Sequence, residues 1–164
     1  MPDQDSPVAS NGETIELISR PAAVLEGKAA RDDIFGAIEG SLKVIKNEID
    51  KAGLKTAGHP LAVFLSATDE EFHYRAEIPV DNPPEGKTEL SSAVTIAQTP
   101  VGKAMRFEHR GAYDDIDATY DAITAYIDEK GVDAQDIFVE QYMTDLTSSE
   151  DPNLVVNIEV LLNK

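Results

Sequence analysis

At 164 residues the chain is long enough for one domain with a sizeable buried core, and its 41% hydrophobic and 27% charged residues are ordinary for a folded protein. Its 14 Lys and Arg against 31 Asp and Glu give a net charge of −17, which disfavours direct binding to nucleic acid and favours cationic ligands or basic protein surfaces. The absence of cysteine excludes disulfides, thiolate metal sites and thiol nucleophiles, and no apolar run is long enough to span a membrane.

Residues 1–13 lack the basic and then apolar pattern of an export signal. Their polar composition predicts a disordered lead-in. The expected compartment is the cytoplasm by default, or the periplasm if an export signal has been removed. Residues 14–164 predict a single domain built from two repeats, about 14–81 and 94–164. The Pro-, Ser- and Gly-rich residues 82–93 connect them, and the run AVTIA at the end of this connection predicts a short strand.

The first repeat predicts a strand, a helix and a hairpin. The apolar stretch PAAVLEGKA precedes a helical stripe with steps of three and four residues, formed by Ile34, Ile38, Leu42, Ile45 and Ile49. Asp32 and Asp33 suit the start of this helix by capping and by the helix dipole, and Gly53 suits its end. The strands PLAVFLSA and FHYRAEIPV follow, joined by the turn TDEE.

The second repeat has the same order. The run VGKAMRFEHRG alternates as a strand does, and the helix after it carries a stripe of Ile116, Tyr120, Ile123 and Ile127, with Gly131 as its stop. Asp114, Asp115 and Asp117 fall in or near the first turn, where carboxylates satisfy free N–H groups and the helix dipole. The runs DIFVEQYMTD and LVVNIEVLLN form the hairpin strands, on either side of the polar turn LTSSEDPN.

These two pseudo-symmetric strand–helix–hairpin repeats predict an α+β fold with adjoining antiparallel sheets. Each repeat has one helix, which covers one face of its sheet. In the combined domain, both helices would cover the same side of the sheets. The other side would be left as an open groove between the repeats, and concave faces of this kind bind ligands.

The second repeat carries residues that resemble the GyrI-like small-molecule-binding domain family. The similar features are Gly111-Ala112-Tyr113, the helix tyrosines Tyr120 and Tyr126, Glu140-Gln141-Tyr142 and Ile158-Glu159-Val160, in a layout that extends over roughly residues 14–163. The chain departs from the family in two respects. It has no tryptophan late in the helix, where Tyr126 is nearest, and the run PLAVFLSA of the first repeat has no acidic residue matching Glu140.

The resemblance implies a stand-alone protein that senses or sequesters an apolar small molecule, either cationic or neutral, without a DNA-binding segment of its own. The family includes effector-binding domains of bacterial transcription regulators. One alternative is a hydrolase acting on a small electrophilic substrate with groove glutamates. Another is an acidic module that inhibits a basic partner protein, as in the inhibition of DNA gyrase that names the family. We favour binding over catalysis, and expect a monomer without a cofactor.

Glu140 is the first candidate for a ligand-binding or catalytic residue. Alternation along its strand places Phe138, Glu140 and Tyr142 on one face. The apolar residues of the other face would pack against the helices, so the acid and its two aromatic neighbours would line the open groove. A carboxylate between aromatic rings attracts an organic cation by charge and by cation–π contacts. If the protein is an enzyme, Glu140 is the candidate acid or base and Tyr142 the candidate donor.

The remaining candidates are weaker. Glu77 and Glu159 hold matching positions in the last strand of each repeat, and both are expected to point into the same groove as Glu140 or to lie on a solvated strand face. Phe64 is expected in the groove, whereas Tyr113 and Tyr126 flank the helix stripe and suit either the pocket or the core. Tyr74 is expected in the core.

No metal site is predicted. The histidines, His59, His73 and His109, lie on separate elements, and none has a second ligand at a spacing typical of metal sites. Haem, which the related SOUL architecture suggests, has no evident axial ligand here. Nucleotide-binding and nucleophile motifs are absent from the sequence, and the run YDDID lacks the spacing of a calcium loop.

Overall fold

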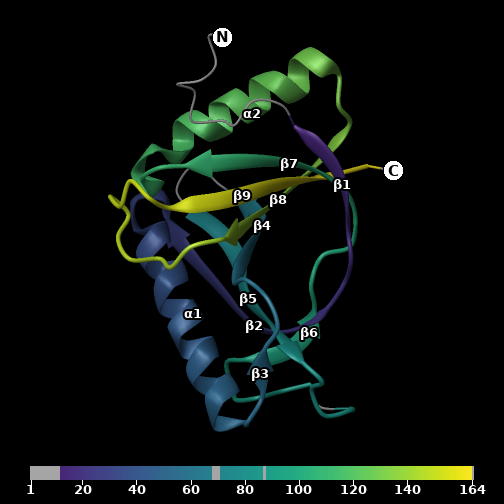
Figure 1. The fold of residues 1–164 in the computed structure, drawn as a ribbon, viewed down its shortest axis with the longest axis vertical. Coiled ribbons are helices and arrows are strands. Elements are labelled where there is room, and N and C mark those ends of the chain that lie inside the picture. Colours follow the sequence, from purple (N-terminus) through teal and green to yellow (C-terminus); the bar gives the residue numbers. More distant parts are fainter. Residues whose placement is uncertain (1–11, 68–70, 87, 164) are drawn as a thin grey trace. The chain divides into compact units, whose positions relative to one another are not determined.

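The computed structural model describes residues 12–67, 71–86 and 88–163 and shows an α+β fold (Figure 1). Most of the expected lead-in, residues 1–11, lies outside the described residues. The chain divides into two compact units. The first unit is Leu17–Val101, and the second unit is Gly102–Lys164 together with the N-terminal residues up to Glu16. Each unit contains the strand, helix and antiparallel hairpin that the repeat predicts.

The first unit is an antiparallel sheet with one α-helix. Its strands run in the order β4-β5-β2-β6, and β3 pairs with β5. The elements are β2 (Pro21–Ala30), the 3-10 turn η2 (Arg31–Asp33), α1 (Ile34–Lys51), β3 (Lys55–Thr56), β4 (Leu61–Ala67), β5 (Glu71–Asp81) and β6 (Thr95–Gln98). The short strand expected in AVTIA is therefore present as β6, whereas β3 was not expected.

Helix α1 packs its apolar stripe onto β2 and β5. All five residues of the predicted stripe are buried, which confirms the helix and its inward face. Tyr74 of β5 also points to α1, because its hydroxyl lies 3.0 Å from the Ser41 hydroxyl. It is 3% exposed, as expected of a core residue. Its ring lies across Gly27 of β2, where a Cβ would come within 2.6 Å of the tyrosine hydroxyl.

The second unit repeats this arrangement with strands in the order β1-β7-β9-β8. The elements are β1 (Glu13–Leu17, whose last residue belongs to the first unit), β7 (Gly102–Arg110), the 3-10 turn η3 (Tyr113–Asp115), α2 (Ile116–Lys130), β8 (Ala134–Tyr142) and β9 (Val155–Leu162). Both β7 and β8 pair antiparallel with β9. Helix α2 ends at Gly131 with φ at +67°, the left-handed conformation that the sequence predicted for its stop.

At the N-cap positions of the two α-helices, the expected side-chain capping bonds are not formed. Asp33 and Asp115 hold the N-cap positions of α1 and α2, and neither side chain makes a capping hydrogen bond. A 3-10 turn precedes each helix instead, and its carbonyl accepts a bond from the first helical N–H, at Ile34 and at Ile116. The turn therefore takes over part of the role that was assigned to the aspartate side chains.

Candidate functional site

A buried carboxylate held by three tyrosine hydroxyls is the main polar feature of the second unit. Glu140 is 1% exposed. Its Oε1 accepts hydrogen bonds from Tyr113 at 2.8 Å and from Tyr142 at 2.7 Å, and its Oε2 accepts one from Tyr120 at 2.6 Å. We call these four residues the Glu140 cluster. Hydrogen bonds to an ionised acceptor are stronger than those between neutral groups, so the cluster solvates the carboxylate inside the protein.

Three elements bring the cluster together. Strand β8 supplies Glu140 and Tyr142, which share a face because they are two residues apart. The turn η3 supplies Tyr113, and α2 supplies Tyr120. The seven-residue spacing of the last two is close to two helical turns, so both hydroxyls reach the same strand. Tyr120 was not predicted as a site residue, although this spacing from Tyr113 could have indicated it.

Burial and charge act on the cluster in opposite directions. Burial raises the pKa of the Glu140 carboxyl, and the hydrogen bonds from Tyr120, Tyr142 and Tyr113 lower that pKa. Burial, and after it the charge of Glu140, raises the pKa of each tyrosine hydroxyl well above its ordinary value. The three hydroxyls therefore keep their protons and remain donors. No described Lys, Arg or His forms an ion pair with Glu140, so among the described residues only hydrogen bonds stabilise its ionised form.

The face assigned to Glu140 was wrong. Phe138, Glu140 and Tyr142 were expected on the side away from the helices, but this face packs against α2. Besides the bond to Glu140, Tyr120 of α2 meets the Phe138 ring edge-on at 5.5 Å between ring centroids. Alternation separates the two faces of a strand without saying which one is covered. The apolar residues of the other face were expected to meet the helices, whereas the tyrosine donors allow the face with Glu140 to pack there.

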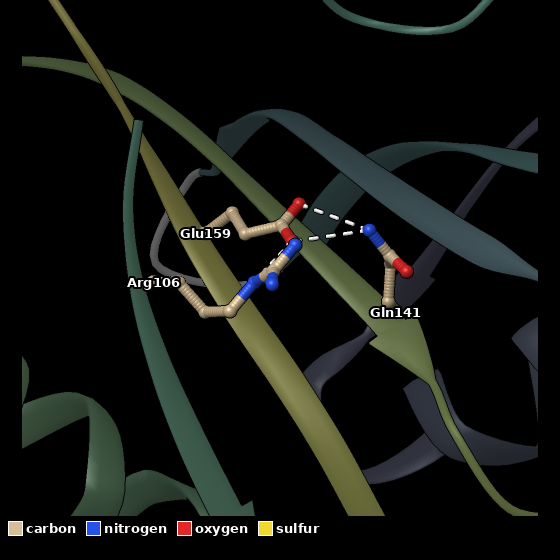
Figure 2. A network of polar contacts seen from close by, with 3 residues as sticks. All are labelled: Arg106, Gln141 and Glu159. Atoms are coloured by element: carbon tan, nitrogen blue, oxygen red, sulfur yellow. Dashed lines mark hydrogen bonds and ion pairs between the residues drawn. The ribbon is translucent and has the colours of Figure 1, made fainter. Parts of the chain in front are cut away.

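Glu159 lies on the opposite face of the same sheet and takes part in a separate network (Figure 2). Arg106 of β7 donates to its Oε2 from Nε at 3.0 Å and from Nη2 at 2.8 Å. Gln141 of β8 donates to Oε2 at 3.0 Å and more weakly to Oε1 at 3.3 Å. Burial raises the pKa of Glu159, while Arg106 and Gln141 lower it. The expectation that Glu159 shares a side with Glu140 was therefore wrong.

Glu77 is a buried acid of the first unit with few partners. It lies on the face of β5 that points away from α1, beside Leu61 of β4 and Val24 of β2. Its Oε2 lies 3.2 Å from Nη2 of Arg75, yet neither carboxylate oxygen has a hydrogen-bond partner among the described residues. Burial raises the pKa of Glu77 to about 7, against the lowering effect of Arg75.

The other aromatic candidates have partners of their own. Phe64 pairs with Tyr74 across β4 and β5, so it shares the face that α1 covers, and its expected place in an open groove was wrong. Its ring meets Phe72 edge-on at 6.1 Å. Tyr126 packs edge-on against Phe107 of β7 at 5.4 Å. Sequence reasoning left Tyr126 open between pocket and core, and this contact is typical of core packing.

The histidines have different surroundings. His59 and His73 are exposed, whereas His109 is fully buried and bonded through both ring nitrogens. In the described part of the chain, no three or more His, Asp or Glu side chains gather where they could hold a metal ion. Among the described helices, none combines the length and the apolar character needed to cross a membrane.

Comparison with known proteins identifies one family. The family model that matches the chain is the GyrI-like small molecule binding domain, over residues 16–162. No curated protein sequence gives a significant match.

Solved structures share the fold at low sequence identity. The EcmrR chain in the cryo-EM structure of the EcmrR–DNA complex in EcmrR-RPo matches with a TM-score of 0.78 and 13% identity, over 96% of this chain and 58% of EcmrR. The crystal structure of the EcmrR C-terminal domain matches with a TM-score of 0.77 and 14% identity, over 94% and 98% of the two chains. SAV2435 bound to tetraphenylphosphonium matches with a TM-score of 0.63 and 15% identity, over 93% and 94%.

Proposed function

We propose that this protein, which belongs to the GyrI-like small molecule binding domain family, binds an apolar organic cation at Glu140 and thereby senses or sequesters it. The observation that carries the proposal is the Glu140 cluster. A carboxylate is buried there among three hydroxyl donors, with no positive charge paired to it among the described residues. An uncompensated buried charge is costly, and a bound cation would neutralise it.

The chemistry of the cluster suits a cation without strong hydrogen-bond donors. The Glu140 oxygens already accept three bonds, so a ligand gains more from charge than from new hydrogen bonds. The rings of Tyr120 and Phe138 add apolar surface and aromatic faces beside the carboxylate. Tetraphenylphosphonium, the molecule bound to SAV2435, is a cation of this class.

Binding requires movement in the cluster. Glu140 is 1% exposed, so a ligand reaches it only if at least one tyrosine side chain gives way. Tyr113 and Tyr120 come from η3 and α2, whereas Tyr142 lies on the same strand as the acid. We therefore expect the helix side to move. The site proposed here needs only the second unit, and the groove expected between the repeats stays a prediction.

A titration of tetraphenylphosphonium by calorimetry tests the proposal. Glu140→Gln keeps the shape of the side chain and removes its charge, and we expect its affinity to fall roughly 10- to 100-fold, as for the loss of one charged contact. Asp136→Asn is the matched control, because Asp136 is an exposed residue of the same strand and its loss changes the net charge equally. If both variants lose the same affinity, the effect comes from general attraction of the cation to the acidic protein. That outcome would contradict a binding site at Glu140.

A hydrolase that uses the same cluster is the second candidate. Its support is the raised pKa of Glu140 together with the Tyr142 hydroxyl 2.7 Å away, a pairing that suits general acid or base work. General acid catalysis needs the Glu140 carboxyl protonated near the working pH, whereas cation binding needs it ionised. NMR titration of that carboxyl distinguishes these two roles. A carboxyl that stays ionised throughout the neutral range would contradict general acid catalysis and would leave cation binding intact.

A further inference from the structure

A buried histidine of β7 links the turn and the helix that supply Tyr113 and Tyr120 to the Glu140 cluster. His109 lies in β7 and is 0% exposed. Its Nε2 lies 2.9 Å from the carbonyl oxygen of Ala112, just before η3, and its Nδ1 lies 2.6 Å from the Thr119 hydroxyl in α2. Thr119 is also 0% exposed. The two contacts connect residues that are seven positions apart in the chain through one rigid ring.

The contact with Ala112 fixes the role of Nε2 in the ring. A carbonyl oxygen only accepts, so Nε2 of His109 carries a proton and donates it to Ala112. In the neutral ring Nδ1 then accepts from the hydroxyl of Thr119. The Ala112 carbonyl also accepts the backbone N–H of Asp115 at 3.0 Å, within the turn that leads into α2. Both nitrogens of His109 are therefore engaged in holding the start of the helix.

Each partner of His109 immediately precedes a tyrosine of the cluster in the chain. Ala112 comes before Tyr113, and Thr119 comes before Tyr120. These two tyrosines supply the bonds that reach Glu140 from the helix side, at 2.8 and 2.6 Å. A shift of a few tenths of an ångström in either backbone segment would change the bond made by the tyrosine that follows it, because hydrogen bonds depend steeply on geometry.

We propose that His109 is a positioning residue of the ligand site, which sets the Tyr113 and Tyr120 hydroxyls against Glu140 by holding Ala112 and Thr119. The inference rests on the proposed function, since it names a determinant of the same site. It also makes a prediction for the ligand-free protein, where the hydrogen bonds of the two tyrosines depend on the contact between His109 and Thr119.

Substitutions at Thr119 test this role more cleanly than substitutions at His109. Thr119→Val keeps the branched shape and removes only the hydroxyl that bonds to Nδ1 of His109. Thr119→Ser keeps the hydroxyl and is the rescue variant. Thr124→Val is the matched control, because Thr124 lies on the same helix with an exposed side chain. All three variants leave the imidazole and the four residues of the cluster unchanged.

The first measurement is the ¹³C NMR spectrum of the ligand-free protein with labelled tyrosine rings. We expect Thr119→Val to shift the Cζ resonances of Tyr113 and Tyr120, while Thr119→Ser and Thr124→Val leave them near their original positions. Unchanged resonances in Thr119→Val, with only a lower melting temperature, would reduce His109 to a purely structural role and would overturn the inference. This measurement does not depend on the identity of the ligand.

The second measurement is the affinity for tetraphenylphosphonium. We expect Thr119→Val to weaken binding roughly three- to tenfold, the size of one lost hydrogen bond. The effect should be smaller in a Tyr120→Phe background, because one of the two hydroxyls through which it acts is already gone. An equal loss in both backgrounds would overturn the positioning role. If the wild type does not bind the probe but the tyrosine resonances shift, the proposed ligand class fails and the positioning role stands.

Discussion

Glu77 and Glu159 hold equivalent positions in the two units, but their hydrogen bonding differs. Glu159 is paired across the sheet with Arg106, which donates two bonds to it. Glu77 is paired with Val24 at the equivalent place, and its nearest cation, Arg75, comes from its own strand. Neither oxygen of Glu77 has a hydrogen-bond partner among the described residues. The buried glutamate at this position therefore accepts hydrogen bonds in the second unit and lacks hydrogen-bond donors in the described part of the first.

Glu77 should make the stability of the protein depend on pH. Its pKa is raised to about 7 in the folded state from an ordinary value of 4.5, so between these values the folded state binds more protons than the unfolded state. Stability should therefore fall as the pH rises from 4.5 to 7. Relative to wild type, Glu77→Gln should gain stability over this window, by roughly 2–3 kcal/mol in total.

Urea unfolding at a series of pH values measures the effect. Asp81→Asn, at the exposed end of the same strand, is the control for the loss of one charge. A stability difference between wild type and Glu77→Gln that does not vary with pH would contradict the prediction. Glu140 and Glu159 also have raised pKa values, but both proteins contain them. Their contributions therefore cancel in the stability difference between wild type and Glu77→Gln.

Arg106 should matter more for stability than an ordinary surface arginine. Arg106→Met would leave the carboxylate of Glu159 buried, with Gln141 as the only remaining side-chain donor among the described residues. We expect a loss of roughly 2–4 kcal/mol in the free energy of unfolding, because removing one partner of a buried pair leaves an uncompensated charge. The arginine side chain is 34% exposed, which moves the expectation toward the lower end.

The double variant Arg106→Met with Glu159→Met is the control for this interpretation. Removing both charges should recover most of the lost stability. A double variant as unstable as Arg106→Met alone would show that the arginine acts through packing. Chemical denaturation of the three proteins under the same conditions provides the comparison.

The tyrosines should tune the pH at which Glu140 loses its charge. Their hydrogen bonds lower the pKa of Glu140, so Tyr142→Phe should raise that pKa further above its ordinary value. Cation binding needs the carboxylate. As the pH is lowered, the affinity should therefore begin to decline at a higher pH in this variant than in wild type. Titrations of tetraphenylphosphonium across the pH range follow the midpoint. Tyr126→Phe removes a hydroxyl outside the cluster, and a similar shift in this variant would contradict the assignment.

Gly27 should be intolerant of a side chain. A Cβ at this position would lie 2.6 Å from the hydroxyl oxygen of Tyr74 and 2.8 Å from its Cζ. Gly27→Ala should therefore displace the ring and weaken its contact with Ser41, at a cost of about 1–3 kcal/mol. Gly36→Ala is the contrasting variant, because nothing lies within 4 Å of its Cβ and alanine favours the helix. The melting temperature should fall in Gly27→Ala and rise in Gly36→Ala. A Gly27→Ala variant as stable as wild type would contradict the packing argument.

The sequence by itself determined the local structure. The three- and four-residue steps of the α1 stripe predict a helix and its buried face, because the helical period places those side chains together. Gly131 predicts the end of α2 for a similarly local reason, since the left-handed backbone there favours glycine. The repeat of strand, helix and hairpin follows from these local patterns, as do the α+β class and the family resemblance carried by Gly111, Tyr113, Glu140 and Tyr142.

Only the tertiary structure decided the surroundings of the acids. Alternation placed Glu140 and Gln141 on opposite faces of β8, but the covered face depends on which helix packs there, and that packing joins residues about twenty positions apart. The three tyrosine donors come from separate elements and make a buried carboxylate tolerable at Glu140. Arg106 does the same for Glu159 from another strand. The residue types were evident in the sequence, and their partners were set by long-range pairing.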